Sequence, residues 1–480
     1  MTEMIPSSEV SFHPHSFGDQ QIRLFQWKGQ LYRALSAEYA DFFKPLFRNQ
    51  TIDDLVRSGL LIDAETTSLA LDGYEMVVHH RKIAFASYPN EWCAAMFKDG
   101  ALTLIELAIE LARRGYTLGD AHPWNLVYDI DHHKTIFVDL GSITRLTDFT
   151  WSLYDEFCRF CLYPLMMMAQ GEDRLARLLM CEDEGIAPFD MRRLKGLSPA
   201  FLLTQSRYWL IRSERGYVRR VPEFYREWLR KAAGLGEENM RRPGSETFNR
   251  PSHPVRAKIH RYFLEGVRRD VERIKIPSTT VQEENILVAA TPQPHCTPAQ
   301  YVWYKLLADL KPRSLLDIGS ESAWHAKVAA LQQIPVVRWD AEPAKVARFY
   351  NDAKEGKLPL LPLVMDFLKP TPGRGWANHR SIPAVDRFQC EMVVALGVLH
   401  RIVAERRLNF DQILDGLLSL ATRWVVVEFR TREQPEAGTQ PIPLSWYTLD
   451  NFLRAAIRRC RQVRTVLQEG NKHLLLCEKY

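Results

Sequence analysis

Acidic residues close three successive apolar segments in the last third of the chain. Asp317 lies in 314–320, Asp340 follows some 20 residues later, and Asp366 ends the third segment. At the carboxyl end of a second parallel strand, a carboxylate can accept hydrogen bonds from both ribose hydroxyls of an adenosine cofactor. We therefore assign Asp340 to the ribose, and Asp366 together with the ring of Phe367 to the adenine base.

The first segment runs from a buried strand into a turn at Gly319 and Ser320, where a ligand can approach the backbone. A strand that ends in Asp more often forms a turn or a helix cap, because Asp bonds the local backbone. Three acidic ends and a glycine turn in this order favour the cofactor hypothesis. A fourth apolar segment ends in His400, which either contacts the substrate as a base or is a structural histidine.

A second set of polar residues lies near position 120. Asp120 and Asn125 are five residues apart, and Asp139 begins an Asp-Leu-Gly sequence after an apolar segment. In kinase-like enzymes such residues are the proton acceptor and two magnesium ligands, so Asn125 and Asp139 would bind metal if the site is active. No glycine-rich phosphate loop precedes them, and Arg33 stands where lysine is expected. Turn-capping residues in a structural domain are the alternative.

The elements around the acidic residues indicate an α/β fold. We predict strands with helical patterns between them, as in a doubly wound, mostly parallel, Rossmann-like sheet. The predicted strands are 314–317, 336–340, 361–365, 392–396, 424–429 and 473–477.

The N-terminal part is predicted to be an α+β, kinase-like domain. Its first elements are two hairpins, formed by 22–27 with 30–35 and by 74–79 with 82–87. A helix over 101–114 ends at Gly115, and residues 150–270 are mostly helical. Prolines near 277–294 mark a boundary. We predict domains at 1–275 and 299–480, joined by a linker at 276–298.

Composition limits the function classes. Of 480 residues, 46% are hydrophobic and 25% charged, which is typical of a globular protein, and a net charge of +5 is too small to indicate a nucleic-acid partner. The most apolar segment, 157–169, is shorter than the roughly 20 residues of a membrane span. Eight scattered cysteines favour reduced thiols, and Cys158 with Cys161 favours core packing over a metal site. We predict a cytoplasmic protein.

The sequence resembles the nodulation protein NoeA-like family of S-adenosylmethionine (SAM) dependent methyltransferases. The residues that carry the resemblance are 71–74, 87–92, 117–125 with 137–139, 315–319, 361–366, 375–378, 395–400 and 425–429. The resemblance implies a class I methyltransferase fold, with Asp317 and Gly319 near the methionine part of SAM, Asp340 on the ribose and Asp366 near the adenine. Two positions depart from the family: Ala323 replaces a second glycine, and Arg401 replaces the second residue of a His-His pair.

These observations predict a SAM-dependent methyltransferase whose kinase-like domain binds the acceptor or acts as a scaffold. Methyl transfer needs mainly the correct placement of the two reactants. For a hydroxyl acceptor, His400 or Glu428 could remove the proton. The family name suggests a glycan or small-metabolite hydroxyl, although the sequence does not identify the acceptor or the oligomeric state. The alternatives are a phosphotransferase that uses Asp120, Mg²⁺ and ATP beside a vestigial methyltransferase domain, and a binding protein without catalysis.

Overall fold

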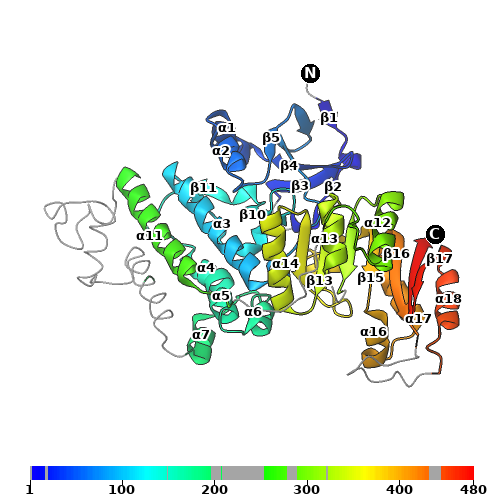
Figure 1. The fold of residues 1–480 in the computed structure, drawn as a ribbon. Coiled ribbons are helices and arrows are strands. Elements are labelled where there is room, and N and C mark those ends of the chain that lie inside the picture. The colour runs from blue at the N-terminus through cyan, green and yellow to red at the C-terminus, as the bar shows by residue number, and fades with distance from the viewer. Residues whose placement is uncertain are drawn as a thin grey trace.

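The computed structural model describes residues 3–16, 20–148, 150–195, 207, 253–277, 289–319, 323–431 and 445–480 (Figure 1). Ser320 of the predicted cofactor turn lies outside them, as do 278–288 of the predicted linker and most of the predicted helical stretch after 195. The domain limits at 276–298 therefore remain a prediction.

A five-stranded antiparallel sheet opens the chain. Its order is β2 (Ser11–Phe12), β3 (Ile22–Trp27), β4 (Gln30–Leu35), β7 (Met76–His80) and β5 (Ala64–Thr66). The helices α1 (Ala37–Arg48) and α2 (Thr51–Arg57) follow β4, and β1 (Glu3–Ile5) pairs separately with β6 (Leu69–Leu71). The first predicted hairpin is confirmed as β3–β4, because Lys28 and Gly29 both hold the positive φ angles that a tight hairpin turn requires.

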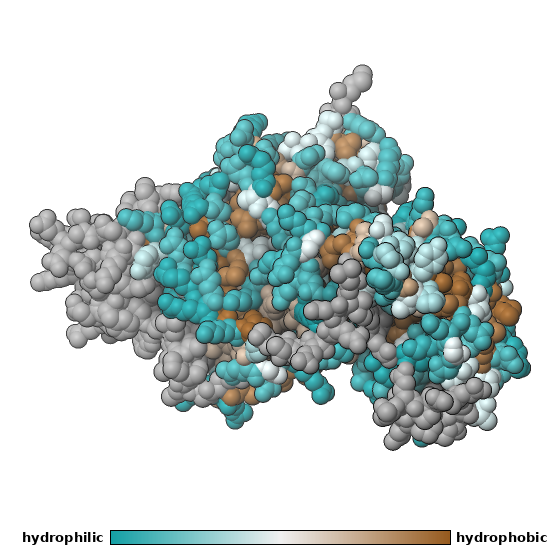
Figure 2. All heavy atoms as spheres, viewed as in Figure 1, coloured by the Kyte–Doolittle hydropathy of each residue, from teal (hydrophilic) through white to brown (hydrophobic). Residues whose placement is uncertain are grey.

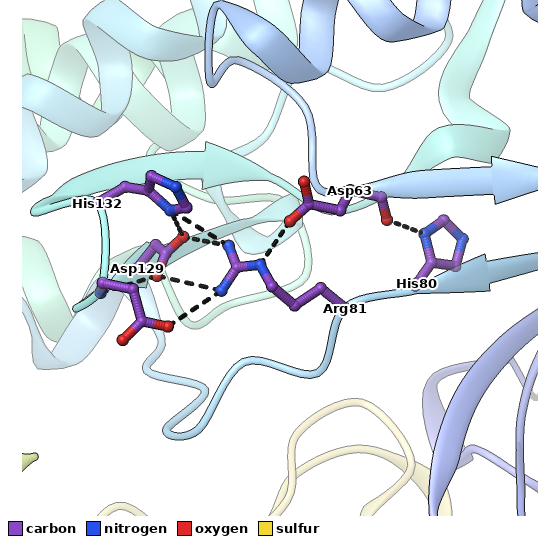
Figure 3. Close-up of polar contacts among 6 residues, drawn as sticks. Asp63, His80, Arg81, Asp129 and His132 are labelled. Atoms are coloured by element: carbon purple, nitrogen blue, oxygen red, sulfur yellow. Dashed lines mark hydrogen bonds and ion pairs between the residues drawn. The ribbon is translucent and has the colours of Figure 1, made fainter.

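The second predicted hairpin is wrong. β7 forms, but it pairs with β4 on one side and β5 on the other, so neither edge is free for residues 82–87. Arg81 leaves the sheet and binds carboxylates of Asp63, Asp129 and Asp131, while His132 bonds Asp129 (Figure 3). This cluster ties the end of β7 to the hairpin formed by β9 (Leu126–Asp129) and β10 (Lys134–Phe137).

A largely helical layer follows the sheet. Helix α3 (Ala94–Arg113) ends where predicted, with Gly115 at a φ of 81°, but it begins before residue 101. Short strands β8 (Tyr116–Leu118) and β11 (Ile143–Arg145) pair beside it, and α11 (His253–Arg273) lies along it (Figure 1). Most of the apolar segment 157–169 is buried, and the predicted core packing of Cys158 and Cys161 is confirmed. Among the described residues that follow β11, the chain also forms α4 (Tyr154–Phe157), the π-helical turn Cys158–Leu162, α5 (Tyr163–Met168), α6 (Asp173–Leu179) and α7 (Pro188–Lys195).

The C-terminal third contains a seven-stranded mixed sheet in the order β14-β13-β12-β15-β16-β18-β17. Only β18 (Lys472–Lys479) runs against the other strands of this sheet. The others are β12 (Leu315–Ile318), β13 (Val336–Asp340), β14 (Leu360–Val364), β15 (Cys390–Ala395), β16 (Ala421–Arg430) and β17 (Cys460–Glu469). All six predicted strands are present. β17 was missed because it is a mostly exposed edge strand of polar sequence.

Helices cover both faces of this sheet. α12 (Pro298–Leu310) and α13 (Trp324–Leu331) pack on one face with Leu315 and Val336, and α14 (Pro343–Gly356) places Phe349 there. α17 (Phe410–Leu420) and α18 (Leu449–Ile457) pack on the opposite face with Val427 and Phe429. The short helices α15 (Ala384–Arg387) and α16 (Leu399–Arg406) flank β15. Helices therefore lie on both faces of a mixed, mostly parallel sheet.

The two halves of the chain share a polar contact that is shielded from water. Arg387 of α15 forms an ion pair with Glu91, and its guanidinium also donates to the Ala86 carbonyl at 2.6 Å. The Arg387 and Glu91 side chains are 4% and 0% exposed, and the guanidinium lies 3.9 Å from the centre of the Tyr88 ring. A further link joins Tyr350 of α14 to Asp99 of α3, two helices that lie side by side in Figure 1. These contacts fix the C-terminal sheet against α3.

The surface differs from the interior as expected for a folded chain in water. On the face shown in Figure 2, hydrophilic residues dominate and hydrophobic residues show only between them. Within the described ranges, no helix has both the length and the apolar character needed to cross a bilayer.

We predict that Arg387→Ala lowers the free energy of unfolding by about 3–5 kcal/mol, because it leaves the Glu91 carboxylate buried and without its cation. Thermal and urea unfolding of the full chain measure this loss. Arg380→Ala is the matched control: Arg380 pairs with Asp183 at the surface, where an ion pair contributes at most about 1 kcal/mol. Equal losses in both variants would contradict the assignment of Arg387 as the central contact.

Candidate functional site

The strand order reverses between β12 and β15, and the predicted cofactor residues gather at the carboxyl ends of these strands and of β13 and β14. In open α/β sheets, ligands bind in the crevice at such a reversal. Gly319 follows β12 with a φ of 57°, a left-handed conformation that favours glycine, and its N–H donates to the Trp339 carbonyl at 2.8 Å. The turn at Gly319 is therefore held directly against the end of β13.

Asp317 is enclosed within the sheet. It is 0% exposed and forms an ion pair with Arg338 of β13, which is itself buried. The Arg338 guanidinium lies 4.3 Å from the centre of the Phe349 ring, and its Nη2 atom is 3.7 Å from an Asp340 carboxylate oxygen. Nothing in the sequence pattern identified Arg338, because one charged residue within a strand does not reveal a partner 21 positions away.

Asp340 and Asp366 both use one carboxylate oxygen for a local turn. Asp340 accepts from the Glu342 N–H and Asp366 from the Leu368 N–H, each at 2.9 Å. Both residues therefore do bond the local backbone, as in the alternative in which an Asp at a strand end forms a turn or a helix cap. Both residues remain partly exposed at the strand ends, so a ligand can still reach their carboxylates.

Phe367 faces an apolar hollow at the same edge. The hollow is lined by Ile318 and Ala395, the last residues of β12 and β15, and by Val398, Leu399, Ile402, Ile413, Leu417 and Val427. A Cβ added at Gly416 would lie 3.0 Å from the Phe367 ring, so α17 packs closely on it. The observed contact of the Phe367 ring is thus with α17. Its contact with an adenine base remains a prediction.

The two candidate bases lie in different elements. His400 is partly exposed in the first turn of α16. Glu428 lies within β16, and its carboxylate accepts from Arg430 Nε at 2.5 Å. The Glu428 carboxylate is therefore already bound by a cation, and it could take a proton from a substrate only by giving up that ion pair.

The two positions that depart from the family have different consequences. Ala323 caps α13 in an ordinary right-handed conformation and is 2% exposed, so no glycine is needed there. Arg401 of α16 is exposed, and one of its guanidinium nitrogens would lie 3.7 Å from a Cβ added at Gly319. Arg401 was noted only as a departure from the family, yet it places a positive charge beside the glycine turn.

The N-terminal set is brought together by the turn that contains Asp139. Ser142 accepts the Asp120 N–H through its Oγ at 3.0 Å, and the Val138 N–H donates to the Asn125 carbonyl at 2.9 Å. The Asp139 carboxylate pairs with Arg33 of β4 at 2.9 Å, and Arg33 also donates to the Val138 carbonyl. The predicted metal ligand is therefore already bound by an arginine that is 7% exposed.

Comparison with known proteins places these observations in context. No protein-family model matches the sequence. The nodulation protein NoeA of Rhizobium meliloti (strain 1021) is 22% identical over 496 aligned residues, covering 99% of this chain and 98% of NoeA. The chain is a distant homologue of NoeA. The NoeA match spans both halves described above.

Solved structures give weaker matches. The bifunctional kinase-methyltransferase WbdD matches with a TM-score of 0.26 and 14% identity, over 37% of each chain, so the match spans little more than a third of WbdD. The N-terminal domain of EvdMO1, solved with SAH and D-fucose, matches with a TM-score of 0.28 and 12% identity, over 39% of this chain and 85% of that domain.

We predict that Mg²⁺ and ATP together leave the melting temperature of the full chain unchanged, because Arg33 neutralises the carboxylate that would hold the metal. Asp139→Asn should instead destabilise the protein by about 1–3 kcal/mol, since it weakens a charged hydrogen bond to a buried arginine. Differential scanning fluorimetry and urea unfolding measure both effects.

Asp131→Asn serves as the control for that experiment, because Asp131 is exposed and Arg81 keeps its other carboxylate partners. The interpretation fails if Mg²⁺ and ATP raise the melting temperature and Asp139→Asn removes the rise.

Proposed function

We propose that this protein is a class I SAM-dependent methyltransferase. The observation that carries the proposal is the strand reversal between β12 and β15, with a left-handed glycine turn after the first strand and acidic residues at the ends of the next two. Physical chemistry makes this edge suited to an adenosine cofactor: the glycine admits the ligand to the backbone, and a carboxylate can accept both ribose hydroxyls. Similarity to NoeA over almost the whole chain supports the proposal.

The residues at this edge fit SAM in charge and position. Asp340 would bind the ribose, Asp366 would accept from the adenine amino group, and Gly319 with Ser320 would lie beside the methionine part. Arg401 adds a cation that suits the methionine carboxylate. Asp317 contributes through Arg338, because its own carboxylate is enclosed.

When bound, SAM supplies a methyl group that leaves a sulfonium by in-line displacement. The chain contributes placement of the acceptor, which can account for a large part of such a rate enhancement. His400, which follows β15 and is partly exposed, is our candidate for removing a hydroxyl proton. Glu428 is the weaker candidate because it is paired with Arg430.

The N-terminal half is proposed to be a kinase-like scaffold that binds or presents the acceptor. Its residues do not fit Mg²⁺ with ATP, because Arg33 pairs with Asp139 and no glycine-rich loop is present to hold phosphates. The phosphotransferase alternative is disfavoured for this reason. A glycan or small-metabolite hydroxyl is the proposed acceptor class.

We predict that Asp340→Ala weakens the binding of S-adenosylhomocysteine at least tenfold, because each charge-assisted hydrogen bond to the ribose contributes about 1.5–3 kcal/mol. Isothermal titration calorimetry measures the affinity. Asp340→Asn keeps an oxygen for the Glu342 N–H and should also bind more weakly if the charge is required.

Glu342→Ala is the control for Asp340, since Glu342 is exposed and pairs with Lys345. Failure of the wild-type protein to bind S-adenosylhomocysteine at millimolar concentration would exclude the methyltransferase proposal and favour a protein that binds without catalysis. Unchanged affinity in a folded Asp340→Ala variant would exclude only the ribose assignment.

Arg401 gives a separate test based on ligand chemistry. Arg401→Ala should weaken S-adenosylhomocysteine binding about tenfold or more but leave 5′-methylthioadenosine binding unchanged, because only the first ligand has a carboxylate for the guanidinium. Arg406→Ala, on the exposed side of the same helix, is the matched control. Equal weakening of both ligands would show that Arg401 acts through the fold.

A further inference from the structure

Three metal-ligand side chains converge next to the turn that holds Asp120. One ligand atom from each of Asp120, His122 and Glu156 lies within 4.8 Å of the other two. Asp120 and His122 come from the segment after β8, and Glu156 comes from α4, where its carboxylate accepts the Ala121 N–H at 3.0 Å. The backbone bond to Ala121 therefore fixes Glu156 against the Asp120 segment.

The charges of this cluster lack compensation from the described residues. Within those ranges, no Lys or Arg forms an ion pair with Asp120 or Glu156, whereas neighbouring Asp155 pairs with Arg159 at 3.0 Å. His122 Nδ1 is shielded from water and has no hydrogen-bond partner in the described part of the chain.

The cluster of Figure 3 shows the contrasting case. There the carboxylate of Asp129 is buried, but Arg81 pairs with it and His132 bonds it, so its negative charge is matched within the chain. These partners lower the pKa of Asp129 despite its burial. The two carboxylate clusters of the N-terminal half thus differ in whether the described residues supply a cation.

We propose that Asp120, His122 and Glu156 bind a divalent transition-metal ion such as Mn²⁺ or Zn²⁺. One imidazole and two carboxylates suit these ions better than Mg²⁺, which prefers oxygen ligands alone. These ions form bonds of about 2.0–2.2 Å, and three ligand atoms within 4.8 Å of one another can reach a single ion with at most small rotations of the side chains. The ligands of this site differ from Asn125 and Asp139, the metal ligands predicted from the sequence. The proposal is also independent of the proposed methyltransferase function.

The direct test is calorimetric titration of the chelator-treated full chain with MnCl₂, ZnCl₂ and MgCl₂. We expect Mn²⁺ and Zn²⁺ to bind one site at least tenfold more tightly than Mg²⁺. His122→Ala and Glu156→Gln should each weaken Mn²⁺ binding at least tenfold. His132→Ala is the matched control, because that histidine is exposed and lies in the cluster already neutralised by Arg81.

A second measurement separates metal binding from loss of structure. Glu156→Gln keeps an oxygen for the Ala121 N–H but removes a charge beside Asp120, so without metal its melting temperature should equal or exceed that of the wild type. Mn²⁺ should raise the melting temperature of the wild type and not that of Glu156→Gln. The proposal is overturned if Mn²⁺ does not bind the wild type at millimolar concentration, or binds Glu156→Gln with unchanged affinity.

Discussion

The ion pair between Glu91 and Arg387 determines how the two halves of this chain meet. Removing a charge from water costs free energy unless an opposite charge is placed beside it with good geometry. The backbone segments that carry Glu91 and Arg387 must therefore keep their relative position. Glu91 also accepts the Tyr88 N–H, and Arg387 also donates to the Ile382 carbonyl, which extends the constraint to the segments on either side. The chain between β14 and β15 is thereby anchored on the N-terminal half. The edge of the sheet that carries Asp366 is positioned by the same contact.

Two further buried arginines follow this rule and decide which carboxylates remain available for ligands. Arg338 forms an ion pair with Asp317 inside the sheet, and Arg33 forms one with Asp139 beside the Asp120 turn. Asp340 and Asp366 keep partly exposed carboxylates at the strand ends, and Asp120 keeps an exposed one. The chemistry open to each half therefore depends less on the acidic residues themselves than on the arginines that neutralise some of them.

The sequence allowed much of the fold to be predicted, for reasons visible in particular elements. Strands buried on both faces, such as Val336–Asp340, have runs of apolar residues that can be recognised in the sequence. The Lys28-Gly29 pair between two alternating segments likewise indicates a tight hairpin turn. β17 was not predicted because an exposed edge strand lacks such an apolar run. Residues 82–87 were wrongly predicted to pair with β7, because their sequence pattern does not show that β4 and β5 already occupy both edges of that strand. The site was harder to predict for a related reason. Arg33 and Asp139 are 106 positions apart, and no local pattern reports a partner at that distance.

Asp120, Asn125 and Asp139 are held together by bonds within the chain. Asp120 is held through its backbone by Ser142, and Asn125 through its carbonyl by Val138, so neither position depends on a bound phosphate. The carboxylate of Asp139 is the part that phosphoryl transfer needs free, and that is the part paired with Arg33. A lysine at position 33 would have left a flexible point charge, whereas the planar guanidinium can bind the Asp139 carboxylate and the Val138 carbonyl together. The Arg33 guanidinium therefore holds the Asp139 turn from within the chain, and the backbone bonds of Asp120 and Asn125 stabilise the same turn without a ligand.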